Sequence, residues 1–183
     1  GVKRVTFKIT GPSIAKAKVS GIGAKTYDGT PQMLDLAMDY NGTALVKGKD
    51  YEVSYQKNVN VGTATILIKG INSYSGTLKK TFKILPCDMG TAADQFKYRV
   101  NGKVYTASAF ASLDMSCAYE KGGSKPYIEV YSVKAAKWLK EGKDYSLTYT
   151  ANTAITTEST KKTPVVSVVG KGNYKGKVNK TFK

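Results

Sequence analysis

The chain contains no histidine among its 183 residues, and only two of its 29 basic residues are arginine. Histidine is the commonest general base, the commonest zinc ligand and the usual pH switch in proteins. Its absence argues against most hydrolytic and zinc chemistry. Arginine also supplies the planar, two-point contacts by which many proteins read nucleic acids, and a coat of lysine lacks them. We therefore expect no nucleic-acid partner.

Sequence patterns that mark catalysis, cofactor binding and membrane spans are also missing. The 13 acidic residues are scattered, with no visible acid/base pair. The glycine-rich segments 70–76 and 170–176 lack the strand-to-helix context of a phosphate-binding loop. No apolar run approaches the roughly 20 residues that span a bilayer. We expect no enzymatic activity, no cofactor, no metal and no membrane insertion.

The positive charge is large and evenly spread. Residues 1–85 hold 13 basic and 5 acidic side chains, and residues 86–183 hold 16 and 8, so each part contributes +8 to the net charge of +16. An even lysine coat keeps the edges of β-sheets from pairing with other chains. It would also suit contact with an anionic cell envelope or an acidic partner.

One sequence pattern occurs twice in the chain, and internal repetition indicates the architecture before any single residue does. The two copies share three pairs of blocks: Gly48–Tyr55 and Gly142–Tyr149, Gly70–Gly76 and Gly170–Gly176, Lys80–Lys83 and Lys180–Lys183. We predict two tandem domains, at residues 13–85 and 86–183. Residues 1–12 are interpreted as the trailing strand of a preceding repeat or a leader, because Val5–Ile9 matches Thr81–Ile84. The chain is expected to be a piece of a longer protein.

Short apolar segments separated by Gly, Asn and Asp clusters predict an all-β fold of tandem β-sandwich domains. In the first repeat, Tyr51, Val53 and Tyr55 alternate with polar residues, as a strand with one buried face requires. The second repeat keeps the same alternation from Tyr145 to Tyr149. No helix is expected in the first repeat.

The second repeat contains an insertion at about residues 89–115. Within it, Phe96–Val100 and Lys103–Thr106 flank the dipeptide Asn101-Gly102. This dipeptide predicts a β-hairpin, because a type I′ turn needs positive φ at both central residues. Residues 107–113 are expected to add a helical turn, and residues 153–164 a longer polar loop than the first repeat has.

Five blocks of the first repeat form one motif: Tyr27–Pro31, Gly48–Tyr55, Asn58, Val61–Thr65 and Gly70–Gly76. Together they resemble the bacterial Ig-like repeats of large Gram-positive surface proteins, which are common in gut Firmicutes. The resemblance covers most of residues 13–85 and, more loosely, 119–183. It implies Ig-like domains in an extracellular, cell-surface protein, either cell-wall-attached or secreted. Such repeats serve as stalks and as binding modules, including some that bind immunoglobulins, and residues 89–115 depart from the pattern.

Two pairs of residues have structural interpretations. Cys87 and Cys117 lie at opposite ends of the insertion, where a disulfide would suit an extracellular protein; the alternative is two reduced thiols. Asp50 and Asp144 occupy the same position of the two repeats. Carboxylates repeated in this way are expected to cap turns rather than to catalyse.

Candidate partner-binding residues gather in the second repeat. Tyrosine and arginine carry a large share of the binding energy in protein interfaces, because they combine contact area with polar reach. The candidates are Tyr98, Arg99, Lys103, Tyr105, Tyr127 and Tyr131.

The predicted hairpin leaves the role of its tyrosines open. Strand alternation puts Phe96 and Tyr98 on one face and Arg99 on the other. Because the face of Phe96 is expected to pack inward, Tyr98 and Tyr105 either support the hairpin or contact a partner. Trp138 is expected to be a packing residue.

These observations predict a non-enzymatic binding module of a bacterial cell-surface protein, in other words an adhesin-type module. It would engage a host or surface macromolecule, with a protein such as an immunoglobulin as the expected partner, and would be monomeric as a fragment. Two alternatives remain: stalk repeats that only project a distal domain, and a carbohydrate-binding module. The insertion favours the first hypothesis, since a pure spacer has no need to elaborate one repeat.

Overall fold

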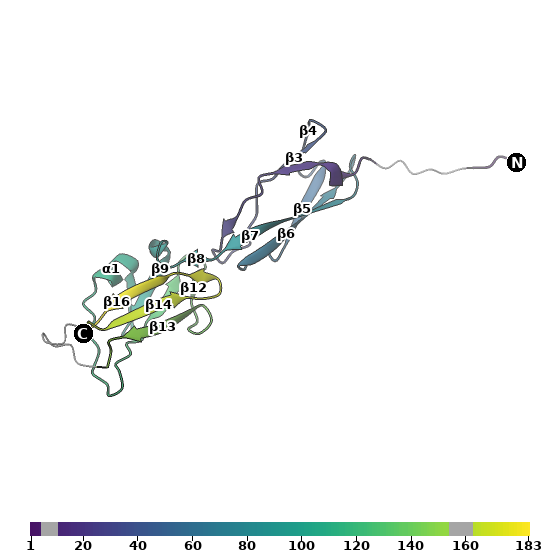
Figure 1. The fold of residues 1–183 in the computed structure, drawn as a ribbon. Coiled ribbons are helices and arrows are strands. Elements are labelled where there is room, and N and C mark those ends of the chain that lie inside the picture. Colours follow the sequence, from purple (N-terminus) through teal and green to yellow (C-terminus); the bar gives the residue numbers. More distant parts are fainter. Residues whose placement is uncertain (5–10, 154–162) are drawn as a thin grey trace. The chain divides into compact units, whose positions relative to one another are not determined.

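The computed structural model describes residues 1–4, 11–153 and 163–183, and nearly all of their regular structure is β (Figure 1). The strand expected at Val5–Ile9 and most of the loop expected at residues 153–164 lie outside these ranges. The all-β prediction is confirmed. Within the described ranges, no helix is long and apolar enough to cross a membrane.

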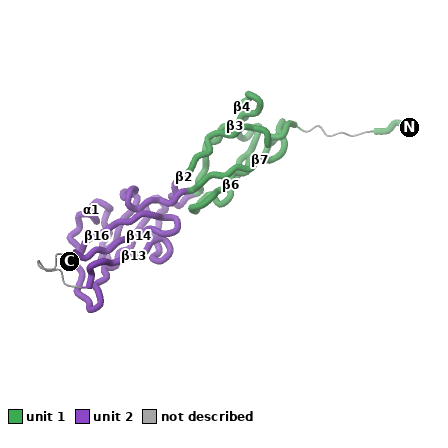
Figure 2. Tube along the Cα trace, viewed as in Figure 1, with its two compact units in different colours: residues 1–25, 31–84 green, residues 26–30, 85–183 purple. Residues whose placement is uncertain are grey.

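The chain divides into two compact units (Figure 2). Unit 1 comprises residues 1–25 and 31–84, and unit 2 comprises residues 26–30 and 85–183. The short segment 26–30, which the repeat pattern assigns to the first repeat, thus belongs to unit 2. There the ring of Tyr27 meets the ring of Tyr174 edge-on, with 5.4 Å between the centroids.

Unit 1 contains two sheets. In strand order, the smaller sheet consists of β1 (Lys18–Ser20), β3 (Ala37–Tyr40) and β4 (Thr43–Leu45), and the larger consists of β2 (Lys25–Thr26), β7 (Thr77–Leu85), β6 (Gly62–Gly70) and β5 (Tyr51–Gln56). A 3₁₀-helix, η1 (Ile14–Lys16), precedes β1. Ala64, Ile66 and Ile68 alternate along β6 and are fully buried, so the predicted alternation of buried and exposed positions forms the core of this unit.

Unit 2 also contains two main sheets. The first, in strand order, consists of β10 (Lys103–Thr106), β9 (Phe96–Val100), β11 (Glu129–Ser132) and β12 (Lys137–Trp138), and the second of β13 (Tyr145–Thr150), β14 (Val165–Gly170) and β16 (Lys177–Thr181). A parallel pair, β8 (Cys87–Asp88) and β15 (Tyr174–Lys175), and two short helices, η2 (Ala93–Gln95) and α1 (Ala107–Ser112), complete the unit. Each unit therefore has a sandwich-like arrangement (Figure 1).

The β9–β10 pair is the hairpin that the Asn101-Gly102 dipeptide predicts. Val100 lies opposite Lys103, and the two turn residues have φ angles of 48° and 79°. Both values are positive, as a type I′ turn requires. The chain then enters α1, whose first turn is capped by the Thr106 hydroxyl, which accepts a hydrogen bond from the backbone N–H of Ala109 at 3.3 Å.

The two units share a strand order, and β10 and α1 distinguish unit 2. The order β9-β11-β12 repeats β1-β3-β4, while β10 adds a further strand beside β9. In unit 2, the backbone N–H of Lys183 donates to the Met115 carbonyl, and the backbone N–H of Cys117 donates to the Lys183 carbonyl. This backbone pairing corresponds to the pairing of β2 with β7 in unit 1. The added residues of the second repeat therefore widen one sheet and place α1 next to it.

The repeated aspartates cap turns, as the sequence predicted. The Asp50 carboxylate accepts a hydrogen bond from the backbone N–H of Val46 at 2.7 Å, and the Asp144 carboxylate accepts one from Lys140 at 3.0 Å. The turn closed by Asp50 leads into β5, and the turn closed by Asp144 leads into β13. The carboxylates are thus occupied by backbone donors and are not arranged for catalysis.

The disulfide expected between Cys87 and Cys117 is absent, and both residues are free thiols. The backbone N–H of Cys87 donates a hydrogen bond to the Asn173 carbonyl, which precedes β16. The backbone N–H of Cys117 donates one to the Lys183 carbonyl, which follows β16. At about 3.3 Å per residue, the five residues of β16 between these two attachment points span roughly 16 Å. A disulfide needs Cα atoms within about 7 Å. The insertion closes through sheet pairing instead of a covalent bond.

Candidate functional site

The outward face of the four-stranded sheet in unit 2 carries the candidate site. Along β9, Phe96, Tyr98 and Val100 are buried, whereas Lys97 is exposed and Arg99 is half-buried. Because successive side chains of a strand point to opposite faces, Lys97 and Arg99 share the outward face. The predicted orientation of the hairpin is confirmed, with the face of Phe96 packed inward.

Sheet register brings three more side chains to these two. Glu129 of β11 lies opposite Arg99, and Tyr131 lies opposite Lys97. On its other side, Tyr131 pairs with Trp138 of β12. We call this group the outer-face cluster: Lys97, Arg99, Glu129, Tyr131 and Trp138.

Arg99 is held in place from two directions. Its Nη1 atom lies 3.0 Å from Oε2 of Glu129, and its Cζ atom lies 3.7 Å from the centroid of the Trp138 ring. The Trp138 ring also meets the Tyr131 ring at 5.3 Å and an interplanar angle of 64°. The side chains of Arg99 and Glu129 remain about one-third exposed, at 32% and 33%. The cluster is therefore ordered by its own contacts and still open to solvent.

Tyr98 is part of the core and is not a contact residue. Its ring is 1% exposed and stacks on Phe110 of α1, with 4.3 Å between the centroids. Burial raises the pKa of Tyr98 to about 12, because the ionised phenolate would be desolvated. Tyr98 was one of the six candidate partner-binding residues, and its burial beneath α1 removes it from that set.

Three further candidates lie outside the cluster, each in a different environment. Tyr105 is opposite Tyr98, so it points to the inward side and is half-buried. Lys103 is exposed, with its Nζ atom 5.5 Å from the Tyr105 ring. Tyr127 is 56% exposed and precedes β11. Only Arg99 and Tyr131, of the six candidates, are brought together in the outer-face cluster.

A groove adjoins the cluster at Lys97. It has a volume of about 540 Å³ and runs between η2, the end of β10 and α1, with Phe96, Ala107 and Ala111 among its lining residues. Thr106, which lies opposite Lys97 in the sheet, forms part of its wall. The groove gives the outer-face cluster an apolar neighbour in which a side chain of a partner could be buried.

Trp138 is the residue of the site that sequence reasoning assigned to packing alone. The short connection Val133–Ala136 between Ser132 and Lys137 has no Gly, Asn or Asp to mark a hairpin turn in the sequence, although Ala136 adopts a positive φ of 49° in the structure. Reading it as a hairpin would have placed Trp138 opposite Tyr131. The approach of Arg99 to Trp138 crosses the intervening strand β11, and no local pattern indicates it.

The cluster combines aromatic, cationic and anionic side chains on one open sheet face. Glu129 is its one carboxylate, and it is paired with Arg99. In the described ranges, no group of three or more His, Cys, Asp or Glu side chains could hold a metal ion. Comparison with protein-family models, with curated proteins and with solved structures finds no match for this chain. The function is therefore argued from the geometry of the site.

Proposed function

We propose that this chain is a non-enzymatic binding module that engages a protein partner through the outer-face cluster. The observation that carries the proposal is Arg99, which is held between Glu129 and the Trp138 ring on an open sheet face. Tryptophan, tyrosine and arginine are the residues that most often dominate binding energy at protein interfaces. Here all three types meet on rigid strands.

Pre-organisation supports the proposal. A long side chain such as arginine loses rotamer freedom when a partner immobilises it, and this loss opposes binding. The contacts of Arg99 already limit its freedom before a partner arrives. Tyr131 and Trp138 have few rotatable bonds and lie against each other. The cluster therefore presents contact area that needs little further ordering.

The charge of the chain indicates the character of the partner. The net charge is +16, and Lys97 of the cluster is exposed. Positive potential over a surface speeds encounters with an acidic partner and disfavours basic ones. The proposed partner is therefore a protein with an acidic surface, docked over the sheet and the groove beside Lys97.

The tandem all-β repeats support a place for this module on a bacterial cell surface. We propose two Ig-like domains, with residues 86–183 carrying the inserted β10 and α1 as the binding domain. A host protein, for example an immunoglobulin, is the proposed class of partner. Two structural features support this assignment: the strand order shared by the two units and the elaboration of only the second.

A pull-down from serum and mucosal secretions tests the proposal. The bait is the intact chain, compared with Arg99→Ala and Trp138→Ala variants and with Tyr119→Ala as the matched control. Tyr119 is 56% exposed and lies outside the cluster. Loss of one dominant interface residue is expected to weaken binding at least about tenfold. Circular dichroism checks that every bait is folded.

The outcomes separate the hypotheses. Capture of one partner that is lost with Arg99→Ala and Trp138→Ala but retained with Tyr119→Ala supports the outer-face cluster as the site. Equal capture by all baits would place the site elsewhere. Capture of no specific partner by the intact chain would overturn the proposal in favour of a stalk that only projects a distal domain.

A further inference from the structure

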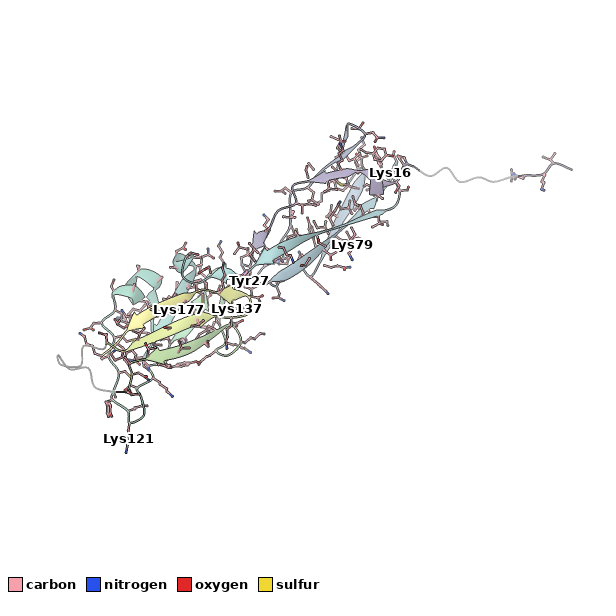
Figure 3. All side chains as sticks on the ribbon, viewed as in Figure 1. Lys16, Tyr27, Lys79, Lys121, Lys137 and Lys177 are labelled. Atoms are coloured by element: carbon pink, nitrogen blue, oxygen red, sulfur yellow. The ribbon has the colours of Figure 1, made fainter. Side chains whose placement is uncertain are left out.

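The outward face of the larger sheet in unit 1 carries exposed lysines that form no ion pair within the described residues. Ala64, Ile66 and Ile68 of β6 point inward, so Lys69 on β6 and Lys79 on β7 point outward. Figure 3 labels Lys79 on its strand. The ion pairs within the described residues all lie in unit 2. Glu52 of β5 lies opposite Lys69, whereas Lys79 has the apolar Leu67 opposite it, so the lysines of this face outnumber the acidic residue beside them.

A groove of about 340 Å³ crosses this face. Ser54 of β5 and Leu67 of β6, which lie opposite each other in the sheet, form part of its floor. Lys47 and Lys69 line its sides, and Lys79 lies directly opposite Leu67 on the neighbouring strand. The groove is at the lower end of the size range of ligand sites in proteins. Two lysines therefore line one open groove together with Glu52, and a third, Lys79, lies on the strand beside it.

The positions of unit 2 that correspond to Lys47, Lys69 and Lys79 carry no lysine. The registers Tyr51↔Gly70 and Tyr145↔Gly170 align the two sheets. On this alignment unit 2 has, in place of the three lysines, Glu141, Val169 and Asn179. Because the two units share the turn that leads into β5 and β13, the fold itself does not require lysine at these positions. The lysines form a local feature of unit 1, not a part of a uniform coat.

The remaining side chains on the face indicate the chemistry of a ligand. Thr65 and Thr81 are opposite each other on the outward face and add hydroxyl groups to that of Ser54. Strands β5, β6 and β7 present no aromatic side chain outward, so there is no platform on which a nucleic-acid base could stack. Glu52 is the one acidic residue that lines the groove.

We propose that this groove binds a linear acidic polysaccharide. The lysines would contact its sulfate or carboxylate groups, and the hydroxyl-bearing floor would accept and donate hydrogen bonds to sugar hydroxyls. This site is separate from the outer-face cluster, and the proposal does not rest on the proposed protein partner. Variants of Arg99 and Trp138 are expected to leave polysaccharide binding unchanged.

The test measures binding of a heparin octasaccharide to the intact chain by isothermal titration calorimetry. The lysine-graft variant replaces the three lysines with the residues of unit 2: Lys47→Glu, Lys69→Val and Lys79→Asn. A control variant makes the same change in net charge on unit 2, with Lys121→Glu, Lys143→Val and Lys177→Asn. All six lysines are exposed, so both variants are expected to fold, which circular dichroism confirms.

The lysine-graft variant is expected to bind heparin roughly tenfold more weakly, because three exposed charge contacts are lost. The control variant is expected to bind as the intact chain does, and a neutral dextran is expected not to bind. Equal weakening in both variants would overturn the proposal, since net charge alone would then explain binding. No heparin binding, or equally tight binding of a single-stranded oligothymidylate that depends on the same lysines, would also overturn it.

Discussion

The guanidinium carbon of Arg99 lies 3.7 Å from the centroid of the Trp138 ring, across the intervening strand β11. This contact, together with the ion pair to Glu129, makes the outer-face cluster a single cooperative unit on the sheet surface. Partly exposed cation–π contacts contribute about 0.5–1 kcal/mol, and a desolvated contact contributes more.

A double-mutant cycle on Arg99 and Trp138 measures this coupling. Arg99→Ala and Trp138→Phe are compared singly and together by denaturant unfolding monitored by circular dichroism. We expect a coupling free energy of up to about 0.5–1 kcal/mol, because Arg99→Ala removes the contact and Trp138→Phe leaves a ring that attracts a cation less strongly. A coupling near zero would show that the two side chains do not stabilise each other. Lys103→Ala combined with Trp138→Phe serves as the uncoupled control pair.

Tyr98→Phe is expected to change the pH dependence of stability. Burial raises the pKa of Tyr98 from 10.0 to about 12. Between these two pH values the unfolded chain loses the proton first, so the folded state binds more protons and its stability falls as the pH rises. This one group contributes at most about 1.4 kcal/mol per pH unit to the fall. The Phe variant should therefore lose less stability than the intact chain between pH 10 and 12.

Below pH 10 the same variant is expected to match the intact chain within about 1 kcal/mol, because the buried Tyr98 hydroxyl has no hydrogen-bond partner to lose. Denaturant unfolding at pH 8 and pH 11 measures both effects. Burial also raises the pKa of Tyr145 and Tyr174, so part of the alkaline decline should remain. An identical decline in the two proteins would contradict the buried, unpaired state of Tyr98.

Replacement of the turn-capping aspartates tests their shared structural role. Asp144→Ala removes the acceptor for the Lys140 N–H and is expected to cost about 1.5–3 kcal/mol, the range for hydrogen bonds to charged groups. Asp50→Ala should have an effect of the same kind in unit 1. The only tryptophan, Trp138, lies in unit 2, so its fluorescence reports on unfolding there. The Asp→Asn variants keep an acceptor oxygen and should be less destabilised.

Without added reductant, we expect the thiols of Cys87 and Cys117 to differ in their rates of alkylation. Cys117 is half-exposed and should be alkylated by iodoacetamide in the folded protein, whereas the buried Cys87 should react only after denaturation. Burial raises the pKa of both thiols, which lowers the thiolate fraction and slows the reaction at neutral pH. Mass spectrometry of peptides counts the labels. Recovery of a peptide pair joined by a Cys87–Cys117 disulfide would contradict the structure.

Local features of the sequence predicted much of the fold because their causes are local. Alternation from Tyr51 to Tyr55 is a direct consequence of one buried strand face, and β5 forms there. Asn101-Gly102 allows the two positive φ angles that a tight hairpin turn requires, and the hairpin forms there. The matching positions of Asp50 and Asp144 predicted that both cap a turn.

The candidate site depended on long-range pairing and could be predicted only in part. Arg99 and Tyr131 were both singled out because of their residue types, but their proximity results from the pairing of β9 with β11. Tyr98 could not be assigned to the core from its strand, because α1 is what covers it. The separation of the two cysteines follows from their attachment to opposite ends of β16.

The sequence by itself determined that this protein is all-β, and its repeated blocks predict two tandem domains with an elaborated second copy. Repetition, strand alternation and turn-forming dipeptides act through the backbone conformation of neighbouring residues, so they can be read along the chain. Only the tertiary structure decided which side chains share a surface: the meeting of Arg99 with Trp138, and the gathering of Lys47, Lys69 and Lys79 around one groove. Sheet register sets these neighbours, and register arises from packing between distant segments.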